Sequence, residues 1–466
     1  MIRLLLVMVS LSILLAFSVI PVIESQAPST IEPLWMYPMP AYDVAVSNDG
    51  SMVAVASNGV YVYNRYGDLL WHWPNDSTIN VTSIDITGDG NVVVAAIINS
   101  TGSTYRVVYW KNARSLSGVP DPDWISSNIG SIIGPEALAV SDNGNYVVAV
   151  GTGYGVYFWN NTLSIPGGSV DVSPHYTNYS SPDPLEFTDI SSDGMVIVAA
   201  GSQTIMAYLN LPITTSPTIH QEPIGCYVTG LDLSNNGSVF AFTCYCIEDS
   251  GSYVVYIDTF AWEELWVSAP LWEYASALDM SEDGEHIVVS TNVHGGSAFS
   301  VYVFHNASEK AEYYVPRGFN GLKESDIGTR LVPEYVVPDY NFTDFDYPED
   351  DIYDVSISNN GGTIAFGTGR SVYILNRKLE LYSVYHGTDY TVSKIVKVSG
   401  DGRYVVSCGD TLDSVYYFKG IWPIPVVGGE ILKYVASITD KLWLPVIGLL
   451  LATSILLSIV KRYKKF

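Results

Sequence analysis

The sequence predicts an all-β protein: a single eight-bladed β-propeller between an export signal and one C-terminal transmembrane helix. Three observations support this prediction. One phrase recurs eight times along the chain, its copies are mostly ~40–50 residues apart, as in four-stranded blades, and an apolar segment lies at each end.

The recurring phrase begins with an alternating strand, continues through a polar turn that ends in Gly, and leads into a second, Val-rich strand. Its first copy runs from Val44 to Gly50, with the turn Ser47-Asn48-Asp49-Gly50. Asn-Gly and Asp-Gly accept the positive φ angles of tight hairpin turns. A third strand rich in Tyr or other large side chains follows each time. The turn glycines are Gly50, Gly90, Gly144, Gly194, Gly237, Gly284, Gly361 and Gly402.

The blade count has two alternatives. Between Gly284 and Gly361 the interval is longer, and we interpret residues 309–351 as an insertion. Ser325 to Gly328 echoes the turn, so a ninth blade is one alternative, and merged copies giving seven blades are the other. We place the propeller at 33–420 and expect Pro33 to Tyr37 to supply the outer strand that the last blade lacks.

With these turns and Tyr-rich strands, the repeats resemble the WD-repeat-like and quinoprotein-like (PQQ-like) propeller repeats of archaeal and bacterial surface proteins. The resemblance spans about Leu34 to Gly420. The family's His and Trp-Asp signatures are absent from most copies. The resemblance therefore implies the fold and a cell-surface protein of archaeal type, without implying an activity.

The N-terminus reads as a signal peptide over residues 1–27. Arg3 gives a basic start, Leu4 to Ile20 form an apolar run, and Ser25 or Ala27 offers a small residue for cleavage. An uncleaved membrane anchor is the alternative. Either interpretation exports the chain.

The C-terminus predicts a membrane helix. Leu442 to Val460 contains no charged residue, and at ~1.5 Å per residue it can cross a ~30 Å hydrocarbon layer. The basic tail 461–466 belongs on the cytoplasmic side. The propeller and the linker 421–441 then face outward, as in a single-pass type I protein of the cell membrane.

Composition limits the partners. The 22 Lys and Arg residues against 48 Asp and Glu residues give a net charge of −26, which argues against nucleic acid. Export agrees with the Asn-x-Ser/Thr triplets, each a candidate glycosylation site. These triplets begin at Asn75, Asn80, Asn99, Asn160, Asn178, Asn236, Asn306 and Asn341.

Four cysteines in an oxidising compartment make one or two disulfides plausible. Cys244 and Cys246 share one face of a predicted strand and cannot easily pair with each other. Cys226 is the nearest further partner, so Cys226 with Cys246 is a candidate disulfide. The pairing stays open, with Cys408 as the fourth cysteine.

The sequence gives little catalytic chemistry. The turn acids Asp49, Asp89, Asp193, Asp283 and Asp401 are explained by hairpin geometry. An acidic stretch containing Asp344, Asp346, Asp350 and Asp351 is a candidate Ca²⁺ loop, with a simply solvated loop as the alternative. The seven histidines show no paired ligand spacing and are interpreted as ordinary surface or strand residues. We predict no other cofactor and no catalytic residue.

The leading functional hypothesis is a membrane-anchored ectodomain that binds or scaffolds a protein or glycan at the cell surface. A surface enzyme, quinoprotein-like or hydrolytic, with its site in the central channel is the second hypothesis. An accessory subunit of an envelope or membrane complex is the third. Whether the protein is an enzyme stays open, and the sequence favours a non-enzyme.

Overall fold

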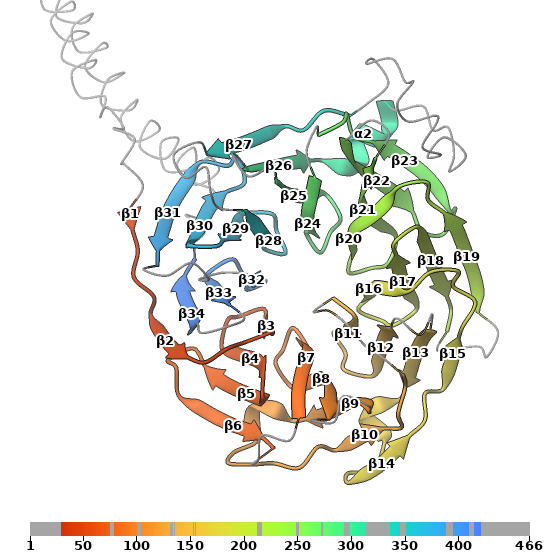
Figure 1. Cartoon of the computed structure of the whole chain (residues 1–466), viewed down its shortest axis with the longest axis vertical. Helices are drawn as coiled ribbons and strands as arrows, with labels where there is room; N and C mark the ends of the chain where they lie inside the picture. The colour runs from red at the N-terminus through yellow and green to blue at the C-terminus, as the bar shows by residue number, and fades with distance from the viewer. Residues whose placement is uncertain are drawn as a thin grey trace, which may run out of the picture.

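Eight small sheets stand around a central channel in the computed structural model, which confirms the eight-bladed propeller (Figure 1). The structure describes residues 29–74, 79–99, 104–130, 134, 136–151, 153, 155–211, 217–247, 251–271, 274–292, 299–313, 336–344, 351–387, 395–409 and 414–420. In each blade the four strands nearest the channel run antiparallel, and the fifth, outermost strand of blades 2 and 7 is parallel to its neighbour.

The first four blades contain these strands, given from the channel outward. Blade 1 has β3 (Asp43–Val46), β4 (Met52–Ser57), β5 (Gly59–Asn64) and β6 (Leu69–Trp73). Blade 2 has β7 (Ile79–Ile86), β8 (Val92–Asn99), β9 (Tyr105–Lys111), β10 (Trp124–Ser126) and β14 (Ser169–Val172). Blade 3 has β11 (Leu138–Val140), β12 (Tyr146–Gly151), β13 (Gly155–Asn160) and β15 (Tyr176–Asn178). Blade 4 has β16 (Leu185–Ile190), β17 (Val196–Gly201), β18 (Thr204–Leu209) and β19 (Thr218–Pro223).

The other four blades complete the ring. Blade 5 has β20 (Tyr227–Leu233), β21 (Val239–Cys246), β22 (Gly251–Asp258) and β23 (Glu263–Val267). Blade 6 has β24 (Tyr274–Met280), β25 (His286–Asn292), β26 (Phe299–His305) and β27 (Tyr340–Asp344). Blade 7 has β28 (Ile352–Ile357), β29 (Thr363–Thr368), β30 (Ser371–Asn376), β31 (Leu381–His386) and β1 (Ser29–Thr30). Blade 8 has β32 (Ile395–Val398), β33 (Tyr404–Cys408), β34 (Ser414–Lys419) and β2 (Trp35–Pro38).

Blade 8 joins the two ends of the propeller, because its outer strand β2 comes from the start of the chain. Trp35 lies opposite Tyr417 in the antiparallel pair of β2 and β34, and their rings stack with centroids 5.0 Å apart. This pairing confirms the role expected for Pro33 to Tyr37.

The turns between the first and second strands share one hydrogen-bond network. In blade 1 the Ser47 hydroxyl donates to Asp49 Oδ1 over 2.9 Å and accepts from the backbone N of Met52 over 3.1 Å. The same hydroxyl-to-side-chain bond, from Ser or Thr to Asp or Asn, occurs in the other seven blades. Gly50 has a φ of +63°, which favours glycine. The turn acids therefore have a structural role, because their side chains accept hydrogen bonds within the hairpin turns.

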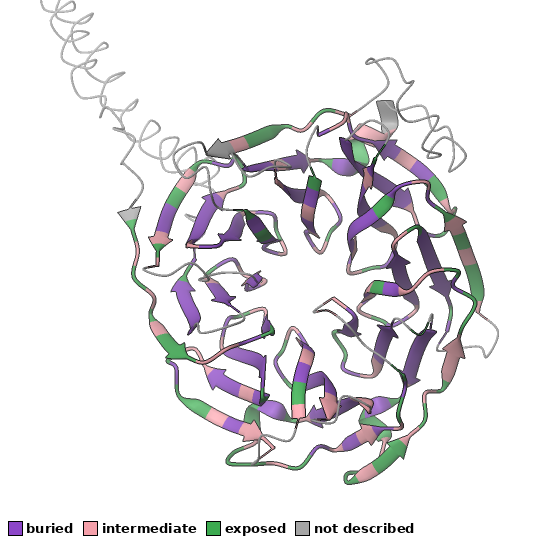
Figure 2. Ribbon diagram, in the orientation of Figure 1, coloured by how far each residue is buried: buried purple, intermediate pink, exposed green. Residues whose placement is uncertain are grey.

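Packing between blades forms the core. The second strands are buried along most of their length, and β4 and β17 are buried along all of it (Figure 2). Because each sheet has a neighbour on both faces, its inner strands are apolar on both sides. The turn glycine of each blade also abuts the blade before it: a Cβ on Gly50 would lie 2.2 Å from Tyr404 of blade 8.

The segment interpreted as an insertion belongs partly to blade 6. It overlaps the short helix α2 (Ala307–Tyr313) and contains β27, the outer strand of that blade. The predicted signal peptide and the predicted span 442–460 lie outside the described residues. Within the described residues, no helix is long and apolar enough to cross a membrane.

Candidate functional site

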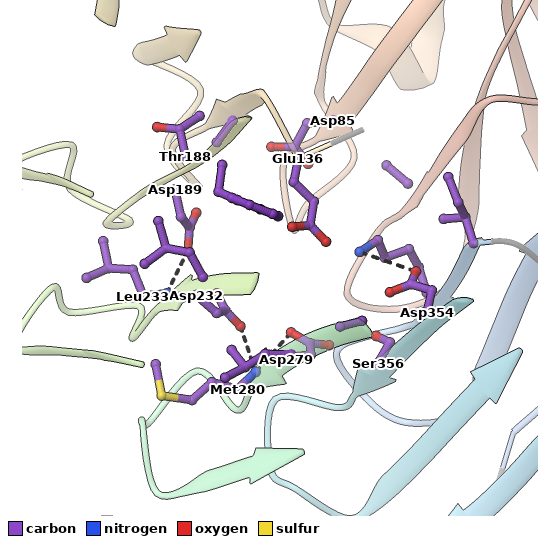
Figure 3. A pocket seen from close by; sticks show the side chains of 18 of the residues that line it. Asp85, Glu136, Thr188, Asp189, Asp232, Leu233, Asp279, Met280, Asp354 and Ser356 are labelled. Carbon is purple, nitrogen blue, oxygen red and sulfur yellow. Dashed lines mark hydrogen bonds and ion pairs between the residues drawn. The ribbon is translucent and has the colours of Figure 1, made fainter. Parts of the chain in front are cut away.

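The central channel encloses a cavity of about 830 Å³, within the ~300–1,000 Å³ of typical ligand pockets. The innermost strands supply its wall (Figure 3). Its charged lining residues are Lys397 and ten acids: Asp43, Asp85, Glu136, Asp142, Glu186, Asp189, Asp232, Asp279, Glu282 and Asp354.

Six of these acids join neighbouring blades. An innermost strand is the edge of its sheet, so alternate N–H groups have no partner in the ladder. Asp43 satisfies two of them: Oδ1 accepts from Val44 N in its own blade, and Oδ2 accepts from Ile84 N in blade 2, both over 2.8 Å. We call such a bridge a carboxylate clamp.

Five further aspartates make the same clamp to the next blade, with cross-blade distances of 2.6–3.0 Å. They are Asp85 to Val140, Asp189 to Leu233, Asp232 to Met280, Asp279 to Ile357, and Asp354 to Val396. Each also accepts from the N–H of the residue that follows it. These carboxylates therefore have a structural task.

Burial and mutual repulsion disfavour the ionised form of the channel acids and so raise their pKa values. Burial raises the pKa of Asp85 and of Glu136 to about 7. Burial also raises the pKa of Asp232 well above its ordinary value, and the charges of Asp279 and Asp189 raise it further. Asp189 shifts in the same direction through burial. Part of the channel wall is thus poised to bind protons near neutral pH.

Lys397 is the single base among the described residues that line the cavity. Its Nζ lies 3.9 Å from Asp354 Oδ2, and 35% of its side-chain surface stays accessible. Burial acts to lower the pKa of Lys397, but the charges of Asp354 and Glu136 outweigh burial and raise it. Lys397 is therefore a cation that offsets part of the acidic lining.

Polar side chains span the channel at its turn face, the face that carries the eight turns. Glu282 Oε1 accepts from Asn48 Nδ2 of blade 1 over 3.4 Å and from Asn359 Nδ2 of blade 7. Gly88 and Gly400 make room: a Cβ on Gly400 would lie 2.6 Å from Asn48 Oδ1. This end of the channel is narrowed by a hydrogen-bonded plug.

The opposite end, which we call the loop face, carries exposed tyrosines where the innermost strands begin. Tyr42, Tyr227, Tyr274 and Tyr353 keep about two fifths of their surface exposed, from 39% to 43%. Tyr274 and Tyr353 also line the cavity. Tyrosine offers contact area and a hydrogen-bonding group at low entropic cost, which suits a binding surface.

The candidate Ca²⁺ residues are not brought together by the described structure. Asp344 ends β27 and Asp351 is exposed before β28, while Asp346 and Asp350 lie outside the described residues. The Ca²⁺ loop stays a prediction.

The triplet asparagines are spread over the ring. Asn80, Asn236, Asn306 and Asn341 are exposed, whereas Asn99, Asn160 and Asn178 are half-buried. Asn75 lies outside the described residues.

The structure joins Cys226 to Cys246 in a disulfide, with Cα atoms 4.5 Å apart. Cys246 ends β21 and Cys226 immediately precedes β20, its antiparallel neighbour. Cys244 is buried beside this disulfide, and the three sulfurs lie within 4.8 Å of one another.

The channel acids were not singled out in the sequence, although a signal was present. Four copies of the repeat carry Asp two residues before the turn Ser or Thr: Asp85, Asp189, Asp232 and Asp279. Aligning the eight copies on the turn hydroxyl would have revealed this column. Asp43 and Asp354 occur two residues earlier, so the same column misses them.

Comparison with known proteins places the fold. No protein-family model matches the chain, and no characterised protein matches it in sequence. Among solved structures, the C-terminal WD40 domain of Sif2 is similar with a TM-score of 0.59 and 10% identity, over 85% of this chain and 99% of that domain.

Two further solved structures agree. The β-propeller domain of Cps50 (Swd1) from Myceliophteria thermophila has a TM-score of 0.50 and 13% identity, over 74% of this chain and 100% of that one. A chain of a mitotic checkpoint complex has a TM-score of 0.50 and 11% identity, over 74% and 90%. At these identities the likeness shows the fold alone: the chain is similar to WD40 β-propellers.

Proposed function

We propose that the chain is a binding or scaffolding module, held on the outer side of a cell membrane, that receives a protein partner on its loop face. The exposed tyrosines around the acidic channel mouth carry this proposal. WD40 propellers are the structural neighbours, and one of them comes from a multiprotein checkpoint complex. That likeness supports a protein partner over a glycan.

The positions of the two ends of the ring support an orientation in which the loop face points away from the membrane. Gly420, the last described residue, donates its N–H to the Arg403 carbonyl beside the turn glycine Gly402. Near the other end, Leu34 N donates to Tyr417 O, where β2 begins. Both ends of the ring therefore lie on the turn face. With a membrane helix at 442–460, the loop face would point away from the bilayer.

Charge sets the kind of partner. The cavity is lined by ten acids against one lysine, and the carboxylates that stay ionised should favour a basic contacting surface on the partner. The rate of association should then fall as salt rises, because screening weakens electrostatic steering.

Site-specific photocrosslinking in the native membrane tests the proposal. A photoreactive amino acid replaces Tyr274 or Tyr353 on the loop face of the full-length chain, or Tyr66 as the control. Tyr66 lies on the turn face and is 78% exposed. We expect a discrete adduct from positions 274 and 353 and none from position 66. Adducts from position 66 alone, or from none of the three, would contradict the proposal.

A surface enzyme with its active site in the channel is the second candidate function, because the channel has the size of a ligand pocket. Mass spectrometry of the gently purified protein separates the two. A stoichiometric quinone or metal would favour the enzyme, whereas associated proteins alone would favour the module.

A further inference from the structure

Blade 6 brings two histidines together that lie far apart in the printed sequence. His286 begins β25 and His305 ends β26, and the antiparallel register places them directly opposite each other. Their Nδ1 atoms are 2.8 Å apart and their ring planes are nearly perpendicular, at 85°. Both side chains are half-buried at the turn-face end of the blade.

The hydrogen bonds define the protonation of both rings. His305 Nε2 lies 2.7 Å from the carbonyl oxygen of Arg377 in blade 7. A carbonyl can only accept, so His305 carries its proton on Nε2 and its Nδ1 has a free lone pair. His286 then donates from Nδ1. An imidazole binds a metal ion through an unprotonated ring nitrogen, such as Nδ1 of His305 in this arrangement.

The fold does not require histidine at these two positions. The equivalent cross-strand pairs in the other seven blades combine apolar, aromatic, polar and charged side chains without any histidine. They are Met52 with Asn64, Val92 with Lys111, Tyr146 with Asn160, Val196 with Leu209, Val239 with Asp258, Thr363 with Asn376 and Tyr404 with Lys419. Blade 6 alone, among these described pairs, offers two imidazoles.

We propose that His286 and His305 form a chelating site for a divalent transition ion that prefers ligands at right angles, such as Cu²⁺ or Ni²⁺. Imidazole nitrogens bind such ions at about 2.0–2.1 Å. Two nitrogens 2.8 Å apart then subtend close to a right angle at the ion. Tetragonal geometry is typical of Cu²⁺ and Ni²⁺, whereas tetrahedral Zn²⁺ needs a wider separation.

The surroundings suit a metal ligand pair. The bond from His305 to the Arg377 carbonyl fixes the tautomer and the ring orientation, as outer-shell carbonyls do at known metal sites. On binding, His286 moves its proton from Nδ1 to Nε2, so both Nδ1 lone pairs face the ion and no proton is lost. Three carboxylates, Asp283, Glu285 and Asp339, act on the pair against two cations, Arg377 and Lys310.

Calorimetric titration of the full-length protein with Ni²⁺ tests the site. The protein is purified without a polyhistidine tag and stripped with a chelator. We expect one equivalent to bind and expect His286→Gln and His305→Gln each to weaken binding by at least about 10-fold, since even outer-shell changes at metal sites cost that much. His72→Gln is the control, because His72 is a half-buried histidine stacked on Tyr61 in blade 1. Unchanged binding in the first two variants overturns the proposal.

Chemical protection in the unmutated protein gives a readout that does not depend on how the variants fold. Diethyl pyrocarbonate modifies accessible imidazoles, and peptide mass spectrometry reports the extent at each histidine. We expect Ni²⁺ to protect positions 286 and 305 and to leave position 72 unchanged. Electron paramagnetic resonance with Cu²⁺ should show two nitrogen ligands. Equal protection of all three histidines, or of none, would overturn the chelating site.

Discussion

Two kinds of junction hold the ring together. Six junctions, such as that between blades 1 and 2, carry a carboxylate clamp. Between blades 3 and 4, Ala139 occupies the column where other copies carry Asp, and Thr188 N donates to the backbone carbonyl of Glu136 instead. Between blades 8 and 1, Lys397 occupies that column and aromatic packing joins the blades.

The difference teaches that a junction needs its edge N–H groups satisfied and its faces packed, and that several residues can meet each need. At the closing junction, Tyr417 packs in an apolar cluster shared with Val53 and Tyr63 of blade 1, and its hydroxyl donates to the Gly50 carbonyl of blade 1. An aromatic side chain there contributes both packing and a hydrogen bond between blades. The carboxylate clamp contributes hydrogen bonds alone.

The largest effect is expected at the closing junction. Tyr417 is fully buried, so Tyr417→Ala should lower the free energy of unfolding by about 4 kcal/mol through lost packing and a cavity. Thermal melting of the full chain measures it. Tyr66→Ala, at an exposed residue, should leave the melting temperature nearly unchanged. Equal melting of the two variants would show that aromatic closure is dispensable.

Removing a carboxylate clamp should lower the free energy of unfolding somewhat less than Tyr417→Ala does. Asp43→Ala removes the acceptor of the N–H groups of Val44 and Ile84, and Asp43 is only 2% exposed. The expected loss is about 2–3 kcal/mol, because two buried donors lose a partner. Asp43→Asn keeps one acceptor oxygen and should recover about half of that loss. If Asp43→Ala melts like the unchanged protein, the clamp adds nothing to stability.

The clamps also predict an unusual pH dependence. Burial raises the pKa of Asp43, Asp85, Asp189 and Asp354 above the value of about 4 in the unfolded chain. The folded state then binds more protons, so stability is fully present below pH 4 and is lost as pH rises through the folded values, near 7 for Asp85. The melting temperature should therefore be higher at pH 5 than at pH 8.

His286 and His305 change the pH dependence of stability in the opposite direction. The lowered pKa of His286 and of His305 costs stability below about pH 6.5. With Asp232 and Glu136, whose pKa values are also raised, six carboxyl groups outnumber the two histidines, so the net slope should keep its sign. The double variant Asp85→Asn with Glu136→Gln should flatten the slope. A protein that melts at a lower temperature at pH 5 than at pH 8 would contradict the raised carboxyl pKa values.

The smallest effect is expected at the junction between blades 3 and 4, one of the two junctions without a carboxylate clamp. Glu136 serves that junction through its backbone carbonyl, while its carboxyl group reaches into the channel (Figure 3). Burial raises the pKa of this carboxyl to about 7, so Glu136→Gln should slightly raise the melting temperature at pH 8. At pH 5, where both side chains are neutral, the melting temperature should not change. A clear loss of stability at both values would give this side chain a structural role.

The propeller could be predicted because its information is local. Each turn glycine such as Gly50 follows an Asp or Asn within a short phrase, and eight copies of the phrase give eight blades. Even the closing strand was predictable, since Pro33 to Tyr37 precedes the first copy and the last copy lacks an outer strand.

The clamps and the histidine pair could not be predicted as readily, because they depend on distance in space. Asp85 meets Val140 only once two blades stand side by side. His286 and His305 become neighbours only through the exact register of β25 and β26. A scan for ligand spacing along the sequence misses such a pair, whereas aligning the hairpins residue by residue would have found it.

The closing strand has a consequence for biosynthesis. The outer strand β2 pairs with β34, so it stays unpaired until the last blade has been made. Export from the N-terminus would deliver β2 near the beginning and β34 at the end of the propeller, leaving an open edge for most of translocation. A chain cut short before β34 cannot close its ring, and its exposed edge would mark it for proteases. The topology thus acts as a check that only complete chains persist.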